Sequence, residues 1–295
     1  MHKPVLLNEV INILDIQEKD IVLDGTVGGG GYLNEICKKI GKSGMVIGLD
    51  QDISALERVR EMKVNCRRHL VNENFRNLDK VLKELDIKKV DKIVFDLGFS
   101  SDQLEDSGRG FSFQKNEPLL MTFKKKPSSD DLIAKEIVNN WDEDNISDII
   151  SGYGEERFAK EIAKEIVLAR KEKTIESTFE LVEIIKKAVP KWYQSKRLHY
   201  ATKTFQALRI TVNDEIGSLK MGLEKAFGLL NEGGIIAIVS FHSLEDRVVK
   251  NYFRKLKENK EGLILTKKPI IPSREEIKNN PRSRSAKLRA IKLGS

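Results

Sequence analysis

The chain has 295 residues, which is enough for a full hydrophobic core and allows one large domain or one domain with a substantial insertion. Lysine plus arginine outnumber aspartate plus glutamate by 52 to 45, and the net charge of +7 suits a polyanionic partner without requiring one. No apolar run reaches the roughly 18 residues of a membrane span, and the first residues lack the layout of a signal peptide, so we expect a cytoplasmic protein without membrane contact.

The cysteines and histidines do not have the spacing of a metal site. Cys37 and Cys66 form no C-x-x-C pair, so we expect two buried thiols rather than a disulfide scaffold or a zinc site. The four histidines are scattered along the chain, at positions 2, 69, 199 and 242. This distribution predicts no metal.

Short apolar runs alternate with segments of helical periodicity, which is typical of a parallel sheet covered on both faces. The predicted strands span residues 20–24, 44–50, 65–71, 91–99 and 233–241, followed by a hairpin-like pair at 262–269 and 286–293. The predicted helices of this part span residues 32–40, 53–62, 75–85 and 243–258. The last of these is predicted to start at an N-cap Ser243 with Asp246 as its partner, a reading that the spacing favours over a hydrolase triad of Ser240, His242 and Asp246.

The alternation stops between about Leu104 and Tyr200, where the chain is strongly charged and helical. One apolar face is predicted from Phe158, Ile162, Ala163, Ile166 and Val167, and Ser177 with Glu180 forms a predicted capping box. We therefore expect residues 1–104 and 201–295 to form one domain and residues 105–200 to form an inserted helical domain.

The stretch "VLDGTVGGGGYLNEI" (22–36) places an acid, a glycine loop and a helix start in succession. Glycine admits positive φ and a close approach of a ligand, and a helix start presents free N–H groups. The G-x-G-x-x-G fingerprint fails, because Leu33 or Asn34 stands where the third glycine is needed. An acid at the end of the next strand, Asp50, can accept both hydroxyls of a ribose. The pattern favours S-adenosylmethionine, which carries no phosphate, over a dinucleotide, and a plain tight turn is the alternative.

Several longer blocks of sequence together resemble those of one known family. They are "HKPVLLNEV", "DLGFSSDQL" (96–104), "RGFSF" (109–113), "FQALRITVNDE", "SFHSLEDRVVK" and "NPRSRSAKLR". Over nearly its whole length the chain resembles the bacterial 16S ribosomal RNA cytosine methyltransferases called RsmH or MraW. The resemblance implies an α/β class I (Rossmann-like) methyltransferase sheet with an inserted helical substrate-recognition domain. It also implies S-adenosylmethionine as donor and the exocyclic amino group, N(4), of a decoding-centre (P-site) cytidine as acceptor.

The resemblance also implies the cofactor contacts, which fall on the matching motif positions Gly30, Gly31, Tyr32, Asp50, Phe75, Asp96 and Gln103. The chain departs from the family at two places. Tyr32-Leu33 replaces the usual His-Ser, and "LLMTF" (119–123) replaces an L-D-M-R-M block, so an acid and an arginine are missing there.

The chemistry of the reaction indicates one catalytic candidate. The lone pair of an exocyclic cytosine amine is delocalised into the ring, so methyl transfer depends on in-line placement and on an acceptor for the amine protons. Asp96 with the following "LGF" backbone is the candidate, and Phe99 could supply a stacking face. A role of Asp96 in cofactor binding alone is an equal alternative.

Two segments are rich in positive charge, as RNA-binding surfaces are. One is the tail "PRSRSAKLR", and the other is a cluster that also contains aromatic rings. The cluster consists of Lys191, Trp192, Tyr193, Lys196 and Arg197. Solvated loops are the alternative for both. The expected partner is 16S rRNA in the small ribosomal subunit or its late precursor, and homodimer formation is left open.

Rival functions are a methyltransferase acting on amino groups of another RNA or DNA, an NAD-dependent oxidoreductase, and a non-catalytic RNA-binding protein. The missing third glycine counts against the oxidoreductase, and a binding protein would leave the glycine loop without a use.

Overall fold

The computed structural model describes residues 4–98 and 107–294. Within them the chain forms two compact units, the first from residues 4–98 and 216–294 and the second from residues 107–215. The second unit continues past the expected boundary at residue 200, because α11 (Thr202–Asn213) buries Phe205 and Leu208 in the core of the helical unit. None of the described helices combines the length and the apolar character needed to cross a membrane.

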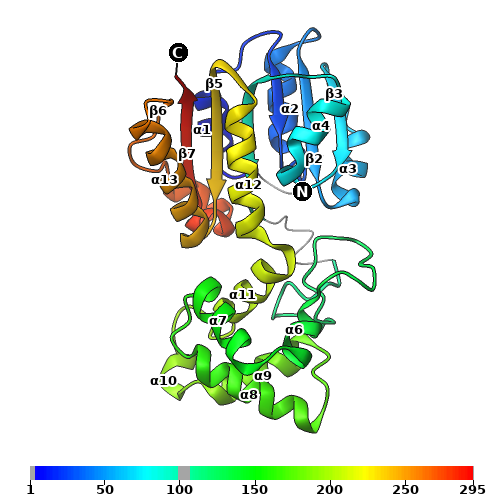
Figure 1. Cartoon of the computed structure of the whole chain (residues 1–295), viewed down its shortest axis with the longest axis vertical. Coiled ribbons are helices and arrows are strands. Elements are labelled where there is room, and N and C mark those ends of the chain that lie inside the picture. Colours follow the sequence, from blue (N-terminus) through cyan, green and yellow to red (C-terminus); the bar gives the residue numbers. More distant parts are fainter. Residues whose placement is uncertain (1–3, 99–106, 295) are drawn as a thin grey trace. The chain divides into compact units, whose positions relative to one another are not determined.

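The first unit is built on a seven-stranded sheet in the order β3-β2-β1-β4-β5-β7-β6 (Figure 1). The five strands from β3 to β5 are parallel, and β7 runs antiparallel to both β5 and β6. The strands are β1 (Ile21–Asp24), β2 (Met45–Asp50), β3 (Arg67–Asn72), β4 (Val90–Asp96), β5 (Leu230–Ser240), β6 (Gly262–Ile264) and β7 (Lys287–Leu293). All seven predicted strands are therefore present, although the strand expected at 262–269 ends at Ile264.

Both faces of the sheet are covered, because successive side chains of a strand point to opposite faces. Val22 packs with α1 and α2 on one face, whereas its neighbour Leu23 packs with α4 and α12 on the other. The helices of this unit are α1 (Leu7–Leu14), α2 (Gly31–Ile40), α3 (Ile53–Arg60), the 3-10 turn η1 (Phe75–Asn77), α4 (Leu78–Glu84), α12 (Glu215–Gly228), α13 (Ser243–Glu258), α14 (Arg274–Asn279) and the 3-10 turn η2 (Pro281–Ser285).

The second unit has a core of its own, to which Phe111, Leu119 and Met121 of the preceding loop contribute together with the helices that follow. These helices are α6 (Ala134–Asn140), α7 (Glu143–Gly154), α8 (Ala159–Glu172), α9 (Thr178–Ala188), α10 (Lys191–Gln194) and α11. The predicted apolar face of α8 is confirmed, with Ile162, Ala163 and Ile166 fully buried. The predicted capping box at the start of α9 is also confirmed, between Ser177 and Glu180.

Two local predictions were wrong. Cys37 and Cys66 are joined in a disulfide with their Cα atoms 5.2 Å apart, because α2 and the segment leading into β3 both lie beside β2, although 29 residues separate the two cysteines in sequence. The N-cap of α13 is His242 and not Ser243: its ring accepts from the Glu245 N–H, and the Glu245 carboxylate accepts from the His242 N–H. Asp246 is thereby left for another contact, described below.

Candidate cofactor and catalytic site

Three aspartates are the last residues of three adjacent parallel strands. Asp50 ends β2, Asp24 ends β1 and Asp96 ends β4, and the sheet order places these strands side by side. Ligands of open α/β sheets bind at the carboxyl ends of the strands. The three acids therefore mark the expected binding edge of the first unit.

Asp24 is buried and Asp96 is half-buried, and each has a buried oxygen without a hydrogen-bond partner among the described residues: Oδ2 of Asp24 and Oδ1 of Asp96. The other oxygen of Asp24 accepts from the Thr26 N–H at 3.1 Å. The Asp96 N–H donates to Oγ1 of Thr26 at 2.6 Å, which ties the end of β4 to the glycine loop. Because a buried carboxylate oxygen without a donor is costly, this edge is suited to a ligand that brings hydrogen-bond donors or positive charge.

The pKa values of the three acids are all raised. Burial raises the pKa of Asp24 to about 7 against a hydrogen bond from Thr26, and the charge of Asp50 adds to the rise. Burial and the charge of Asp24 raise the pKa of Asp96 to about 8. Burial raises the pKa of Asp50 to about 6 against hydrogen bonds from Asp52 and Gly28. Near neutral pH Asp24 and Asp96 are therefore partly protonated, and a cationic ligand would favour their ionised forms.

Asp50 holds the glycine loop in place through a hydrogen bond. Its Oδ2 accepts from the Gly28 N–H and its Oδ1 from the Asp52 N–H, both at 2.8 Å. A carboxylate oxygen has a second lone pair, so these bonds leave each oxygen able to accept one ribose hydroxyl. The predicted ribose contact thus remains compatible with the geometry, and Asp50 also has a structural task that the sequence did not indicate.

The glycine positions of the loop are under different structural constraints. Gly30 has a φ of 74°, and a Cβ there would lie 2.7 Å from Sδ of Met62. A Cβ on Gly31 would lie 2.7 Å from Cγ of Pro4. Gly28, with a φ of 51°, is the open position, since a Cβ there would meet nothing closer than 3.8 Å. Internal packing therefore accounts for Gly30 and Gly31, and their contact with the cofactor stays a prediction.

Two aromatic residues of the predicted site are buried. The Tyr32 hydroxyl donates to the Val5 carbonyl, so it ties α2 to the N-terminal segment and is already engaged. The Phe75 ring lies 4.8 Å from the Phe95 ring between their centroids, and Phe95 in turn lies against Gly25 of the loop. Any contact of Tyr32 with a cofactor would therefore use its ring or backbone. Gln103 and Phe99 lie outside the described residues.

Sequence reasoning missed two residues of this edge. Asp24 was noticed as the acid before the glycine loop but was not included among the cofactor contacts. Phe241 follows β5, and its ring is so close to Gly98 of the "DLGF" motif that a Cβ there would lie 2.7 Å from it. The signal for Phe241 was its place in the "SFHSLED" block, next to the predicted strand end.

The prediction that the basic tail contacts RNA is wrong for Arg289. Arg289 is buried, and its Nε donates to Oδ1 of Asp246 at 2.6 Å, while Nζ of Lys287 lies 3.1 Å from Oδ2. Arg289 therefore holds β7 to α13 and is not available to RNA. Arg284 is exposed and remains a candidate for phosphate contact.

Three motifs meet inside the second unit. The Asn213 side chain donates to the Met121 carbonyl at 2.7 Å and accepts from the Phe123 N–H at 2.9 Å, so α11 clamps the "LLMTF" segment. Nη1 of Arg109 donates to the Phe123 carbonyl at 2.6 Å. "RGFSF", "LLMTF" and "FQALRITVNDE" are thus held together by hydrogen bonds, and Leu119 and Met121 are core residues there.

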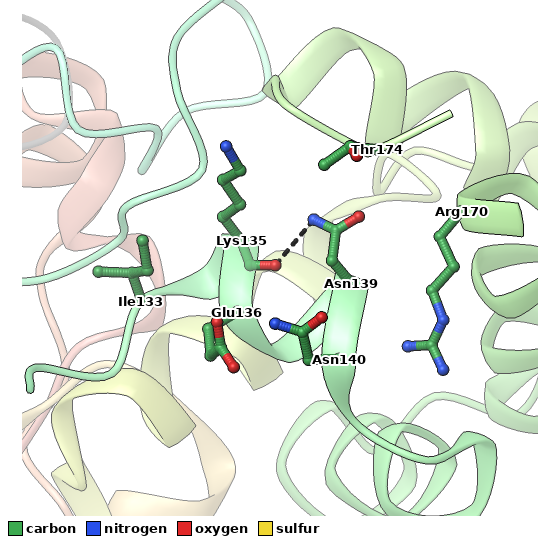
Figure 2. A pocket seen from close by; sticks show the side chains of 7 residues that line it. All are labelled: Ile133, Lys135, Glu136, Asn139, Asn140, Arg170 and Thr174. Carbon is green, nitrogen blue, oxygen red and sulfur yellow. Dashed lines mark hydrogen bonds between the residues drawn. The ribbon is translucent and has the colours of Figure 1, made fainter. Parts of the chain in front are cut away.

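A cavity of about 400 Å³ opens in the second unit (Figure 2). The Asn139 amide at its wall donates to the carbonyl of Lys135 (Figure 2) and to that of Ile175, and Nη1 of Arg170 donates to the carbonyls of Val138 in α6 and of Trp141 just after it. These polar groups hold the helices together, and none belongs to the predicted site. The lining residues are Ile133, Lys135, Glu136, Asn139, Asn140, Arg170 and Thr174.

The edge formed by the three aspartates fits S-adenosylmethionine. The cofactor carries a sulfonium and an ammonium, which match the oxygen of Asp24 that has no hydrogen-bond partner among the described residues, and a ribose, which matches Asp50 at the neighbouring strand end. Gly28 leaves room for backbone approach. No phosphate-binding arrangement is required, in agreement with the missing dinucleotide fingerprint.

Comparison with known proteins also supports S-adenosylmethionine as the cofactor. The chain matches the MraW methylase family over residues 1–293. It is 44% identical over 307 residues to ribosomal RNA small subunit methyltransferase H of Clostridium botulinum (strain Kyoto / Type A2), covering 99% of this chain and 98% of that protein. The protein of the same name from Persephonella marina is 45% identical over 293 residues, again covering 99% and 98%.

Among solved structures, an rRNA methylase from Streptococcus thermophilus covers 100% of this chain and 99% of its own, with 12% identity and a TM-score of 0.43. A likeness of this size adds nothing to the assignment. The match along nearly the whole sequence is sufficient: the chain belongs to the MraW methylase family, and it is an S-adenosylmethionine-dependent methyltransferase.

Proposed function

We propose that the protein methylates the exocyclic amino group, N(4), of a decoding-centre cytidine in 16S rRNA, in the cytoplasm, on the small ribosomal subunit or its late precursor. The names of the curated relatives support rRNA of the small subunit as the substrate. The observation that carries the proposed chemistry is the buried oxygen of Asp96, at the carboxyl end of β4, that has no hydrogen-bond partner among the described residues.

When bound, S-adenosylmethionine supplies an electrophilic methyl group that needs no metal. Asp24 would hold the cationic part of the cofactor, because its Oδ2 faces no other donor among the described residues. Asp50 would accept the ribose hydroxyls while keeping Gly28 in place. These two residues bind and orient, and their contacts are similar in the ground state and the transition state.

Asp96 would accept a hydrogen bond from the cytosine amine. This bond draws electron density toward the nitrogen and stabilises the positive charge that develops as the methyl group is transferred. Its carboxyl is fixed at the end of β4, whose backbone is bonded to Thr26, so little reorganisation is required. Phe241, which lies against Gly98, places an aromatic ring beside this motif for stacking on a base.

The second unit would contribute substrate recognition. Its core is independent of the sheet, and its "LLMTF" segment replaces an acid and an arginine of the usual family block with buried or half-buried apolar and hydroxyl groups. Contacts to RNA in this unit would therefore be made by other residues than in relatives that keep the block.

The test is mass spectrometry of 16S rRNA nucleosides from cells with the gene, without it, and complemented with the Asp96→Asn variant. We expect N(4)-methylated cytidine only with the wild-type gene. A methylated adenine or a modified large-subunit RNA would instead point to the alternative of another nucleic-acid amine. An unchanged nucleoside profile on deletion would refute the assignment.

A further inference from the structure

The second unit presents a cluster of aromatic rings and cations that has no task in the cofactor site. We call it the Trp192 platform, and it consists of Arg157, Phe158, Trp192, Tyr193 and Lys196. Trp192 and Tyr193 belong to the short helix α10, Lys196 follows it, and Arg157 and Phe158 lie just before α8. Trp192 is 52% exposed, an unusual state for so large a side chain.

Two cations lie over the exposed indole. The Arg157 guanidinium is 5.3 Å from the centre of the Trp192 ring and 5.1 Å from that of Phe158. Nζ of Lys196 is 5.1 Å from the centre of the Trp192 ring and 5.0 Å from that of Tyr193. These distances are within the range of cation–π attraction. The rings therefore hold both positive charges beside the exposed indole.

Buried contacts hold the Trp192 platform in place. The Tyr193 hydroxyl donates to Oε2 of the buried Glu156 at 2.6 Å, and Oε1 of the same carboxylate accepts from the Phe158 N–H at 3.0 Å. The Phe158 and Tyr193 rings pack edge to face at 4.9 Å. Tyr193 is almost fully buried, so it fixes α10 to the core and leaves its neighbour Trp192 outside. The exposure of Trp192 is thus built into the fold.

The charge around the indole is positive. Lys191 and Arg197 are also exposed and flank the platform in sequence. Of the acids next to Arg157, Glu156 is buried under Tyr193, and only Glu155 is exposed. An exposed ring with cations beside it is complementary to a single-stranded nucleic acid, in which bases stack and phosphates pair with arginine and lysine.

We propose that the Trp192 platform binds a single-stranded segment of rRNA, with one base stacked on Trp192 and the adjacent phosphates held by Arg157 and Lys196. The proposal rests on the proposed function, since it assigns an RNA contact to the second unit. It concerns a surface separate in sequence from the three aspartates, so it predicts an effect on RNA affinity and none on cofactor affinity.

The first experiment measures binding of a single-stranded RNA oligonucleotide to the full chain. In a Trp141→Phe background, quenching of the remaining tryptophan reports on Trp192 directly. Trp192→Ala should weaken RNA binding by about 5- to 150-fold, the usual range for removing one stacking platform, and Trp192→Phe should restore most of the affinity. The matched control is Phe179→Ala on α9, since Phe179 is 45% exposed in the same unit and lies outside the platform.

The second experiment separates stacking from charge. The double variant Arg157→Gln with Lys196→Gln should lower the slope of log affinity against log salt by about 0.7 per lost phosphate contact, whereas Lys164→Gln on α8 should leave it unchanged. Heparin, which has charge but no bases, should bind without quenching Trp192. Quenching by heparin equal to that by RNA would overturn the stacking role.

The outcomes for the platform and for the enzyme are distinguishable. If Trp192→Ala and Phe179→Ala bind RNA equally well while the wild type methylates small subunits, the platform proposal is wrong and the proposed function stands. If the wild type neither binds nor methylates rRNA, the proposed function fails first. Loss of affinity for whole subunits with unchanged affinity for free RNA would identify a protein partner and overturn the RNA assignment. Cofactor affinity and the melting temperature of each variant show whether it is folded.

Discussion

The acids at the carboxyl edge of the sheet and the acid at the start of α13 are the same residue type in two opposite settings. Asp24 is buried and Asp96 is half-buried, each has a buried oxygen without a donor among the described residues, and burial raises the pKa of both. Asp246 is also largely buried. Burial would raise its pKa too, but hydrogen bonds from Arg289 and Lys287 outweigh that effect and lower it.

The contrast separates a ligand site from a structural ion pair. A buried acid paired with a cation inside the chain is satisfied in the folded protein, so its removal should damage stability. A buried acid left without a donor is unfavourable in the free protein and becomes favourable only when a ligand supplies the missing charge or donor. Variants of the two kinds should therefore lose different properties.

The largest effect is expected for Asp96→Asn. If Asp96 accepts a hydrogen bond from the amine, the rate at saturating cofactor should fall by about 10²- to 10⁴-fold, the usual contribution of a positioned base. Stability should be unchanged or slightly higher, because a buried group that is costly to ionise becomes neutral. Single-turnover methyl transfer to small ribosomal subunits measures the rate. A normal saturated rate with weakened cofactor binding would restrict Asp96 to cofactor binding.

Asp246→Ala should instead unfold the protein more easily, by about 3–5 kcal/mol, because Arg289 is left buried without its partner. Urea unfolding monitored by circular dichroism gives the change. Asp79→Ala is the control, since the Asp79–Lys225 pair is partly exposed and should be worth less than about 1 kcal/mol. Equal losses in the two variants would contradict the structural role given to Asp246.

Asp50 combines the two settings, since it binds the loop backbone and faces the ligand edge. Asp50→Ala should weaken cofactor affinity by about 10- to 150-fold through loss of charge-assisted bonds to the ribose, with a smaller effect on the saturated rate. Asp52→Ala is a suitable control, because Asp52 caps α3 by accepting from the Ser54 N–H. Calorimetry on both variants decides the matter: wild-type affinity in Asp50→Ala would remove Asp50 from the site.

The smallest effect concerns pH. Because the folded pKa values of Asp24 and Asp96 are raised above the usual value of 3.8, to about 7 and about 8, their contribution to stability is fully present below about pH 4 and is lost as pH rises through the folded values. The cofactor-free protein should thus become less stable from about pH 4 to about pH 8.

Cofactor affinity should show the opposite trend, increasing at least about tenfold from pH 6 to pH 8, because the cation binds the ionised acids. Calorimetry in buffers of different ionisation enthalpy measures the protons released. Asp24→Asn should reduce that release, and a release unaffected by this change would show that Asp24 does not face the cation.

The sequence alone was sufficient for the strands of the sheet, and it predicted where the binding site lies. Short apolar runs predicted the central strands β1, β2, β4 and β5, because burial on both faces leaves a continuous apolar signature. The edge strand β3 is only partly buried and has no such run. The acid, glycine loop and helix start at residues 24–32 and the acid at Asp50 predicted the site, since strand ends of a parallel sheet meet at one edge. The N-cap of α13 was misplaced by one residue because His242 can also accept a hydrogen bond at this position.

Only the tertiary structure decided which charged residues are satisfied. Asp24, Asp96 and Asp246 look alike in the sequence, and Arg289 looks like the rest of the basic tail. The pairing of β5 with β7 brings Arg289 to Asp246 across 43 residues of sequence, and no comparable cation reaches Asp24 among the described residues. Whether an acid binds a ligand or supports the fold depends on its neighbours in space, and sequence spacing carries no information about contacts made between distant segments.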